Sequence, residues 1–469
     1  MNEILILMKS EWVLLLIIII FLFIKVGSTE WKNENLLYLA NILLLINFIL
    51  GFVLNTDGII FDEMFKTNSL ICLEKNILNL GTLLISLQSY HWLKNHKHVA
   101  EFYMLLLSTL LGMFFMISSN NLLMFYLGLE LSTIPLAALA NFDLHKRQSS
   151  EAAFKLIISS ALSSGLLLFG ISLLYGTSGT LNLSEISQHL NGSNLQLFAF
   201  ILLLAGFAFK ISAVPFHLWT ADVYEGSPVA VTSYLSVISK GAVLFVFVSV
   251  LYTVFKSLGI AWYNMLILLS VLTMIIGNLF AIRQNNIKRL LAYSSIAQVG
   301  FILAGISGCS QLGTTSVIYF ILIYVFSNLG AFGVVSIISS TTGKETISDY
   351  KGLYKSNPFL SWTITIALFS LAGIPPTAGF FGKFFLIMSA AQNGNYLFIS
   401  IAALNMVISL YYYLILVKAI FMDKNEQAIE KIHVPILPKI AMLICTAGII
   451  IVGLYGEIYE YIFKLSFGY

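Results

Sequence analysis

The sequence predicts an all-α polytopic membrane protein, because it is strongly apolar, sparsely charged and built from repeated long apolar runs. Of its 469 residues, 58% are hydrophobic and 10% are charged, whereas an ordinary soluble protein carries roughly 25% charged residues. Each apolar run is long enough to cross about 30 Å of hydrocarbon. Soluble domains are therefore excluded, and so is a β-barrel, whose strands would alternate polar and apolar residues.

The apolar runs predict about 14 transmembrane helices joined by short loops. Their ranges are 12–26, 36–55, 70–90, 99–118, 120–140, 151–176, 195–222, 228–256, 260–282, 289–306, 314–340, 358–390, 395–421 and 437–458. Residues 1–26 carry Glu3 and Glu11 and lack a small-residue cleavage pattern, so their apolar run is expected to remain as the first span.

Two of the predicted helices are interrupted by proline. Helix 7 contains Pro215, and helix 12 contains Pro375 and Pro376. Proline removes a backbone donor and clashes with the preceding turn, and paired broken helices are typical of inverted-repeat transporters. We therefore expect two inverted five-helix repeats with broken helices 7 and 12. The expected domains are 1–98 (helices 1–3), 99–256 (helices 4–8), 257–421 (helices 9–13) and 422–469 (helix 14).

The distribution of Lys and Arg predicts the orientation. Loops that follow odd-numbered helices, with the adjacent helix ends, hold 16 of these residues, and the opposite side holds five. Those five are Lys9, Lys66, Lys75, Lys256 and Lys464. Because basic residues gather on the cytoplasmic side, both termini are expected on the outer side.

Five charged residues lie within predicted spans: Glu130, Lys155, Lys210, Lys240 and Lys383. A charge at mid-bilayer costs at least about 2.5 kcal/mol, so such residues usually mark an ion or proton path. The other acidic residues are expected in loops or near helix ends, which leaves Glu130 as the anionic partner of a lysine on a neighbouring helix. Glu130 could instead be neutralised by burial or bound to backbone.

The lysines differ in how strongly the sequence places them inside the membrane. Lys210 and Lys240 are near mid-span, where the side chain cannot readily reach the surface; each could exchange protons or form a structural ion pair. Lys155 could pair with Glu151 four residues earlier, and Lys383 could extend outward or end a path. His217, beside the first break, could relay protons or be a hydrogen-bonded packing residue.

Motifs for energy-yielding chemistry are absent from the sequence. There is no Walker A loop, dinucleotide-binding GxGxxG or haem-attachment pattern, and Cys72, Cys309 and Cys445 stand apart without metal-ligand or disulfide spacing. No cofactor or metal is expected in this chain, and nothing suggests nucleic-acid binding. Energy for pumping must come from a partner subunit or from an ion gradient.

Five segments resemble one known family: GLELSTIPLAAL, EAAFKLIISSALSSGLLLFGISLLYGTSG, FKISAVPFHLWTADVYEGSPVAVTSYLSVISKGA, RQNNIKRLLAYSSIAQVG and LAGIPPTAGFFGKF. They resemble the antiporter-like membrane subunits of NADH:quinone oxidoreductase (respiratory complex I), within these the subunit N branch. The resemblance covers roughly residues 60–420. Subunit L is longer, and subunit M typically carries glutamate where Lys383 stands. One departure is Ala221, where the family pattern suggests a proline, on a predicted loop.

The resemblance implies roles for the charged residues. Glu130 and Lys210 would form an ion pair, Lys155 would modulate it, Lys240 would be the central relay and Lys383 would lie near the outlet. Cytoplasmic protons would enter near helix 7 or 8 and leave near helix 12. NADH, FMN, iron–sulfur clusters and quinone would bind in partner subunits. The chain would contact an antiporter-like neighbour, small membrane subunits and the lipid bilayer of the bacterial inner membrane.

Three other functions are compatible with parts of this pattern. A subunit of a multisubunit cation/proton antiporter, or of a related membrane-bound hydrogenase complex, would use the same charges with other partners. A purely structural membrane subunit would use the lysines only to hold helices together. A metabolite transporter is disfavoured, because no site beyond the charged series is evident.

Overall fold

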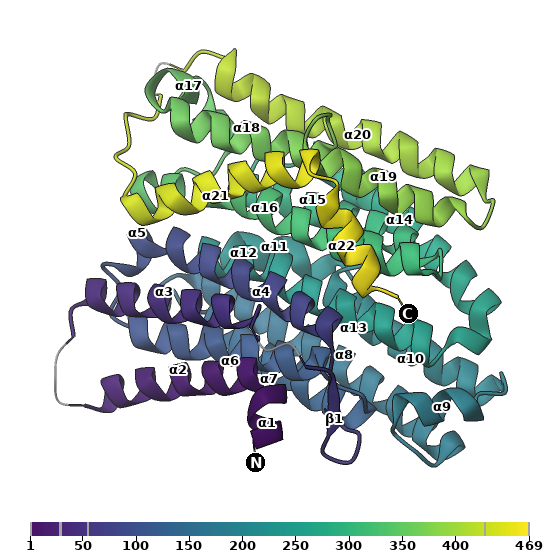
Figure 1. Cartoon of the computed structure of the whole chain (residues 1–469). Coiled ribbons are helices and arrows are strands. Elements are labelled where there is room, and N and C mark those ends of the chain that lie inside the picture. Colours follow the sequence, from purple (N-terminus) through teal and green to yellow (C-terminus); the bar gives the residue numbers. More distant parts are fainter. Residues whose placement is uncertain (1, 28–30, 54–55, 426–427, 468–469) are drawn as a thin grey trace.

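The chain forms a helical bundle, described by a computed structural model for residues 2–27, 31–53, 56–425 and 428–467 (Figure 1). Its first part comprises α1 (Asn2–Leu7), α2 (Lys9–Val26), α3 (Asn33–Leu50), β1 (Gly58–Ile60), β2 (Phe65–Thr67), α4 (Ser69–Gln88) and α5 (Tyr90–Leu93). The middle comprises α6 (Val99–Ile117), α7 (Leu122–Ala140), α8 (Arg147–Ser178), α9 (Leu183–His189), α10 (Asn194–Ile211), α11 (Leu218–Gly226), α12 (Val229–Tyr234), the π-helical turn η1 (Leu235–Ser239) and α13 (Lys240–Thr253). The last part comprises the 3₁₀ turn η2 (Lys256–Leu258), α14 (Gly259–Ile282), α15 (Ile287–Ile306), α16 (Gln311–Thr342), the 3₁₀ turn η3 (Ile347–Tyr350), α17 (Leu353–Ser356), α18 (Pro358–Ala372), α19 (Ala378–Ala391), α20 (Tyr396–Phe421), α21 (Ile436–Leu454) and α22 (Glu457–Leu465).

The predicted all-α membrane fold is confirmed. Among the described residues, 12 helices are long and apolar enough to cross a membrane. The helix α2 has the necessary length but carries Lys9, Glu11 and Lys25, and α18 and α19 are shorter apolar helices. With α2, and with α18 and α19 as one broken span, the helices coincide with the fourteen predicted ranges. Residues 54–55, at the predicted end of the second span, lie outside the described residues.

Both predicted helix breaks are present. The first separates α10 from α11 at Ser212–His217, and the second separates α18 from α19 at Gly373–Thr377. Each break leaves backbone groups that must find partners away from water. At the first break, the Trp219 indole donates to the carbonyl of Phe209 (3.2 Å) and Val214 N–H donates to Thr273 Oγ1 (3.0 Å). Neutral side chains therefore form hydrogen bonds with the backbone groups that this break leaves free.

Three local features differ from the sequence prediction. Strands β1 and β2 form a short antiparallel hairpin before α4, in a segment expected to be a loop. Helix 8 contains the π-helical turn η1 directly before Lys240, and such turns often occur at functional sites. Ala221 lies in α11 and is buried, so the prediction of a loop there was wrong.

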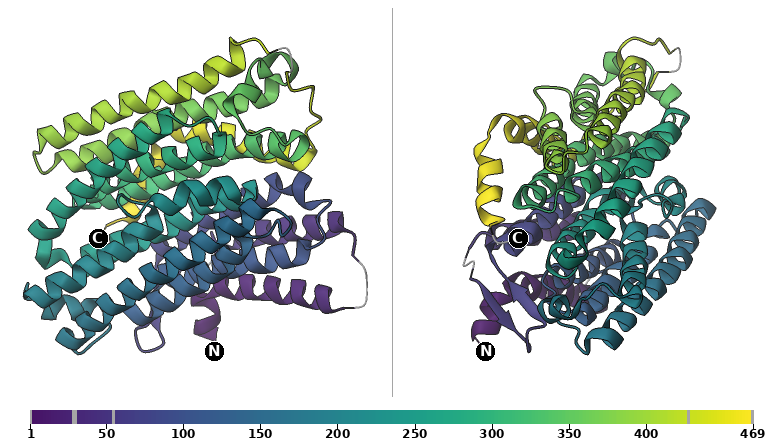
Figure 2. Two further views of the ribbon diagram at one scale, coloured as in Figure 1. Left: turned by 180° about the vertical axis from the view of Figure 1, so that it is seen from behind. Right: turned by 90° about the vertical axis from the view of Figure 1, so that its right-hand side faces the viewer.

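The two halves of the bundle lie on either side of a central helix, α16. Helices up to α13 gather in one half and α14 to α21 in the other, as seen from front and back (Figures 1 and 2). In the most apolar stretch of α16, 94% of the residues are buried, whereas in that of α21 33% are buried. In both predicted repeats the third helix, α8 or α16, has 32 residues and precedes a broken helix. These shared features agree with two repeats, although the repeat boundaries remain a prediction.

Candidate proton-translocation site

The first group of charges lies where α7, α8 and α10 meet. Lys210 Nζ donates to Thr133 Oγ1 (2.8 Å) on α7 and Ser160 Oγ (2.7 Å) on α8. Glu130 lies one turn before Thr133, close enough for its charge to act on Lys210, and its Oε1 is buried without a hydrogen bond. Among the described residues no direct ion pair joins Glu130 to Lys210. The expected ion pair is therefore not formed, and Lys210 instead binds the hydroxyls of Thr133 and Ser160.

Lys155 belongs to a different set of charges from Lys210. Its Nζ lies 2.8 Å from Glu151 Oε1 and 2.6 Å from Asp222 Oδ2 on α11. The other Asp222 oxygen, Oδ1, accepts from Arg289 on α15 (2.8 Å), and Arg289 also pairs with Glu225 (2.7 Å). The pair with Glu151 was expected from the sequence. The carboxylate of Asp222, which joins Lys155 to the second half, was not.

Lys240 is the central lysine and is enclosed, with 2% of its surface exposed. Its Nζ donates to Ser295 Oγ on α15 (2.9 Å) and lies 5.5 Å from the ring centre of Tyr224 on α11. In the described part of the chain it has no carboxylate partner. A cation–π contact and one hydroxyl therefore hold this lysine.

Lys383 lies at the second helix break and is 1% exposed. Its Nζ donates to the carbonyls of Leu371 (2.7 Å) and Ala372 (3.2 Å), the last residues of α18, and lies 4.8 Å from the Phe301 ring centre. The carbonyl end of a helix carries partial negative charge and favours a cation. Gly373 follows at φ +87°, and a Cβ there would lie 3.2 Å from Lys383 Cδ. Lys383 thus binds the groups that the break leaves free and does not extend outward.

A polar connection runs between Lys240 and Lys383 through α15 and α20. Gln298 Nε2 donates to the Leu371 carbonyl (2.9 Å), the same oxygen that Lys383 binds, and to the Tyr413 hydroxyl (3.2 Å). The Tyr413 hydroxyl also bonds to Ser294, the neighbour of the Ser295 that holds Lys240. Two hydrogen-bonded sets, one from Lys240 to Ser295 and one from Ser294 to Lys383, therefore meet at these neighbouring serines, which share no hydrogen bond among the described residues.

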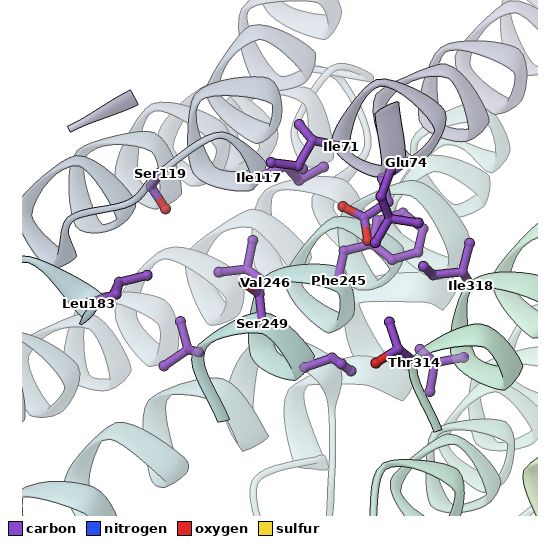
Figure 3. A pocket seen from close by; sticks show the side chains of 14 residues that line it. Ile71, Glu74, Ile117, Ser119, Leu183, Phe245, Val246, Ser249, Thr314 and Ile318 are labelled. Atoms are coloured by element: carbon purple, nitrogen blue, oxygen red, sulfur yellow. The ribbon is translucent and has the colours of Figure 1, made fainter. Parts of the chain in front are cut away.

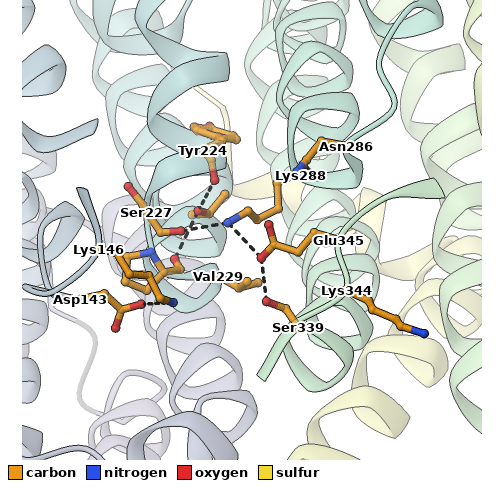
Figure 4. A network of polar contacts seen from close by, with 12 residues as sticks. Asp143, Lys146, Tyr224, Ser227, Val229, Asn286, Lys288, Ser339, Lys344 and Glu345 are labelled. Carbon is orange, nitrogen blue, oxygen red and sulfur yellow. Dashed lines mark hydrogen bonds and ion pairs between the residues drawn. The ribbon is translucent and has the colours of Figure 1, made fainter. Parts of the chain in front are cut away.

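A polar cavity of about 420 Å³ opens on the side that carries most of the Lys and Arg residues. Across it, Lys288 Nζ lies 3.2 Å from Glu345 Oε1, which accepts from Ser339 (2.7 Å), and the opposite wall carries the Lys146–Asp143 pair (2.8 Å) (Figure 4). The cavity lining includes Glu225, Ser227, Lys288 and Glu345. Since Tyr224 precedes Glu225 and lies against Lys240, the cavity ends close to the central lysine.

His217 caps the start of α11 and is buried, and its Nδ1 has no hydrogen-bond partner. The structure shows no contact between His217 and any of the lysines of the series among the described residues. It therefore lies beside the first break, as expected, without a visible polar link to the charges.

The sequence did not predict several buried or bridging charges. Glu11 on α2 and Lys75 on α4 form a buried ion pair of 2.5 Å, with each side chain 3% exposed, and Glu74 is buried as well. The expectation that Glu130 was the one acidic residue in the interior was therefore wrong. Glu11, Glu74 and Lys75 lie near helix ends, and the packing of other elements makes these positions interior ones: Phe65 of β2 lies against Lys75, and α13 and α16 lie beside Glu74.

Metal binding finds no support in the geometry. Within the ranges that the structure describes, no group of three or more His, Cys, Asp or Glu side chains could hold a metal ion. The three cysteines are unpaired. The chemistry available is thus hydrogen bonding and proton exchange by lysine, carboxyl and hydroxyl groups.

These features define a class: antiporter-like membrane proteins, with two broken helices and a line of buried lysines. Residues 119–409 match the family described as NADH:quinone oxidoreductase/Mrp antiporter, TM. A chain of respiratory complex I from Thermus thermophilus superposes with a TM-score of 0.82 at 28% identity, covering 96% of this chain and 97% of that one. A chain of the Mrp complex from Dietzia sp. DQ12-45-1b gives 0.86 at 18% identity, covering 98% and 97%, and shows the shared fold alone.

Full-length sequence similarity identifies the branch. NADH-quinone oxidoreductase subunit N of Azobacteroides pseudotrichonymphae genomovar. CFP2 is 46% identical over 468 residues, covering 97% of this chain and 96% of that protein. The chain belongs to the NADH-quinone oxidoreductase subunit N family. The predicted resemblance is confirmed: the family model covers both the oxidoreductase and the Mrp antiporter, and the nearly full-length relatives belong to the oxidoreductase.

Proposed function

We propose that Glu130, Lys210, Lys240 and Lys383 form a path along which protons move through this chain, with Lys155 and His217 beside it. As a member of the subunit N family, the chain is part of the proton-pumping membrane arm of NADH-quinone oxidoreductase. The observation that carries the proposal is the polar connection between the two lysines: Lys240 bonds to Ser295, and the next serine, Ser294, begins a hydrogen-bonded set that ends at Lys383. A structural role for the lysines alone would not require such a connection.

The path would be driven by electrostatics. Two unit charges about 4 Å apart interact by about 4 kcal/mol at an effective dielectric constant of 20, so a change near Glu130 can alter the proton affinity of Lys210. Lys210 would then pass a proton toward Lys240. Because Lys240 and Lys383 are bound by neutral groups, each can gain or lose a proton without breaking an ion pair.

Protons would enter through the polar cavity that Lys288 and Glu345 line. Three residues of one segment support this entrance. Glu225 and Ser227 line the cavity, and Tyr224, which precedes Glu225, lies against Lys240. The ion pair of Lys288 with Glu345 would control access. Exit would occur near helix 12, beyond Lys383.

A neighbouring subunit would cover the face made by α7 and α8. This face carries exposed apolar side chains, including Leu127, Ile134, Phe154 and Leu162. Glu130 and Lys210 are half-buried beneath it in the isolated chain. Because charges so close to hydrocarbon are costly, we expect protein rather than lipid at this place, in agreement with an antiporter-like neighbour in the membrane arm.

The remaining partners follow from the same assignment. NADH, FMN, iron–sulfur clusters and quinone would bind in other subunits, whose redox reaction supplies the free energy. Small membrane subunits and lipid would surround the rest of the chain in the bacterial inner membrane. Both termini would lie on the outer side, as the Lys and Arg distribution predicts, and residues 99–256 and 257–421 would be the two inverted repeats.

The proposal is tested by Lys210→Met in the assembled enzyme. Methionine fills a similar volume and cannot carry a proton, so we expect normal assembly with pumping reduced by about 100-fold, at the lower end of the usual contribution of a proton-transfer group. Proton uptake and NADH oxidation in proteoliposomes provide the measurement. Lys464→Met, which removes an exposed lysine of α22, is the control. An unchanged proton-to-electron ratio in Lys210→Met would contradict an essential role.

A further inference from the structure

A small cavity lies at the end of the bundle opposite the Lys- and Arg-rich side, between α4, α13 and α16. It has a volume of about 20 Å³, which is room for about one water molecule. Its polar lining comes from Glu74 on α4, Ser249 on α13 and Thr314 on α16, with Phe245 and Ile318 beside them (Figure 3). None of these residues belongs to the path from Glu130 to Lys383.

Two polar groups on this cavity have no protein partner. Glu74 is 7% exposed and forms no hydrogen bond or ion pair within the described residues, and Thr314 Oγ1 is buried without a hydrogen bond. The neighbouring charge, Lys75, is engaged by Glu11 at 2.5 Å. A buried carboxyl without partners is costly when charged, and orphan polar groups around a water-sized space are the conditions under which a protein holds an ordered water.

The cavity lies one helical turn from the layer beside Lys240. A Cβ built on Gly241, the residue after Lys240, would lie 3.4 Å from Leu78 Cδ2 and 3.1 Å from Ile321 Cγ2. One turn further along, these three helices present Phe245, Glu74 and Ile318, a step of about 5.4 Å. Leu78 and Ile321 thus form an apolar layer between Gly241, the residue after Lys240, and the cavity that Glu74 lines.

We propose that Glu74, with one water in this cavity, is a proton-holding site between Lys240 and the membrane face opposite the cytoplasmic cavity. Glu74 rests as a carboxylic acid and releases its proton through the water to the outer face. When the Leu78–Ile321 layer then admits water, the Lys240 ammonium transfers a proton to the resulting carboxylate, which leaves a neutral amine and restores the carboxylic acid. This site rests on the proposed function and gives the first half of the chain an outlet separate from Lys383.

The test compares three variants of the assembled enzyme. Glu74→Gln keeps the shape of the side chain and removes its proton exchange, and Thr314→Val removes one hydroxyl from the cavity. Thr315→Val is the matched control, because the Thr315 hydroxyl bonds to the Gln311 carbonyl and does not line the cavity. The measurements are coupled turnover in proteoliposomes and the infrared carbonyl band of protonated carboxyl groups.

We expect Glu74→Gln to lower coupled turnover by about tenfold, a modest value for loss of a proton-transfer group, and to remove one carbonyl band. Thr314→Val should shift that band and lower turnover less, while Thr315→Val should match the unmodified enzyme. Unchanged turnover and an unchanged infrared spectrum in Glu74→Gln would overturn the proposal. A carbonyl band that changes with the sodium concentration would also overturn it. If Glu74→Gln does not assemble, an unchanged band and turnover in Thr314→Val would overturn it.

Lys210→Met and Glu74→Gln together distinguish failure of the proposed path from failure of the outlet at Glu74. If Lys210→Met pumps normally, the proposed path is wrong whatever the Glu74 band does. If Lys210→Met loses pumping while Glu74→Gln keeps both turnover and band, the path stands and the outlet at Glu74 fails.

Discussion

The two lysines near the face of α7 and α8 and the two enclosed lysines are held in different ways. Lys155 and Lys210 are half-buried near the face of α7 and α8, and carboxylates of Asp222, Glu151 and Glu130 lie in contact or nearby. Lys240 and Lys383 are 2% and 1% exposed, and their amines contact hydroxyl, carbonyl and aromatic groups, with no carboxylate within ion-pair distance in the described part of the chain.

This difference suggests that the two pairs of lysines have separate functions. A lysine with a carboxylate close by changes its proton affinity when that carboxylate moves, because opposite charges favour the charged form. A lysine bound by neutral groups has no such partner to lose, and it responds to charges that arrive next to it. Lys155 and Lys210 would therefore receive the signal from neighbouring subunits, and Lys240 and Lys383 would carry the proton onward.

The largest loss of coupled turnover is expected from substitutions at Lys383. Lys383→Arg keeps a positive charge on the α18 carbonyls but cannot release a proton, so we expect assembly with coupled turnover reduced by about 100-fold. Proteoliposome turnover of Lys383→Arg and Lys383→Met would be measured together. If the lysine only holds the helix end, the arginine variant should work and the methionine variant should not.

The next largest effect is expected at Tyr413. Tyr413→Phe removes the hydroxyl between Ser294 and Gln298 and leaves the ring, so a link worth about 0.5–1.5 kcal/mol is lost, equivalent to about two- to tenfold in rate. Tyr103→Phe is the control, since the buried Tyr103 hydroxyl bonds to Ser86 on α4 and has no part in the polar connection. Equal pumping rates in the two variants would count against the polar connection.

A smaller effect is expected at Asp222, which lies in the first half. Its carboxylate is 36% exposed in the isolated chain, and exposed pairs contribute up to about 1 kcal/mol, or about fivefold in rate. Asp222→Asn should slow turnover by no more than that and leave assembly intact. A loss as large as that of Lys383→Arg would show that Asp222 is itself part of the path.

The smallest effect is expected at His217. Among the described residues its Nδ1 has no hydrogen-bond partner, and its ring interacts with the Pro215 backbone and with none of the lysines, so His217→Gln removes no link to the charged series and should change turnover by less than about twofold. Turnover measured between pH 6 and 8 would check this. A pH profile that loses an inflection in the variant would instead support a relay through the imidazole.

Hydrophobic run lengths and prolines predicted the spans and both breaks, because bilayer thickness and the missing proline donor act locally along the chain. The same pattern could not reveal that Lys383 binds the carbonyls of its own broken helix, or that Asp222 joins Lys155 to Arg289. Those contacts depend on how helices distant in sequence pack. Glu74 was overlooked for a related reason: its position near a helix end is an interior one only when α13 and α16 are in place.

The proton-to-electron ratio of an assembled Lys240→Met enzyme tests the central claim most directly. Lys240 is enclosed, has no carboxylate partner among the described residues and stands between the two halves. In the Lys240→Met enzyme we expect slower electron transfer to quinone or fewer protons moved per electron. Unmodified turnover together with an unmodified ratio would contradict that claim.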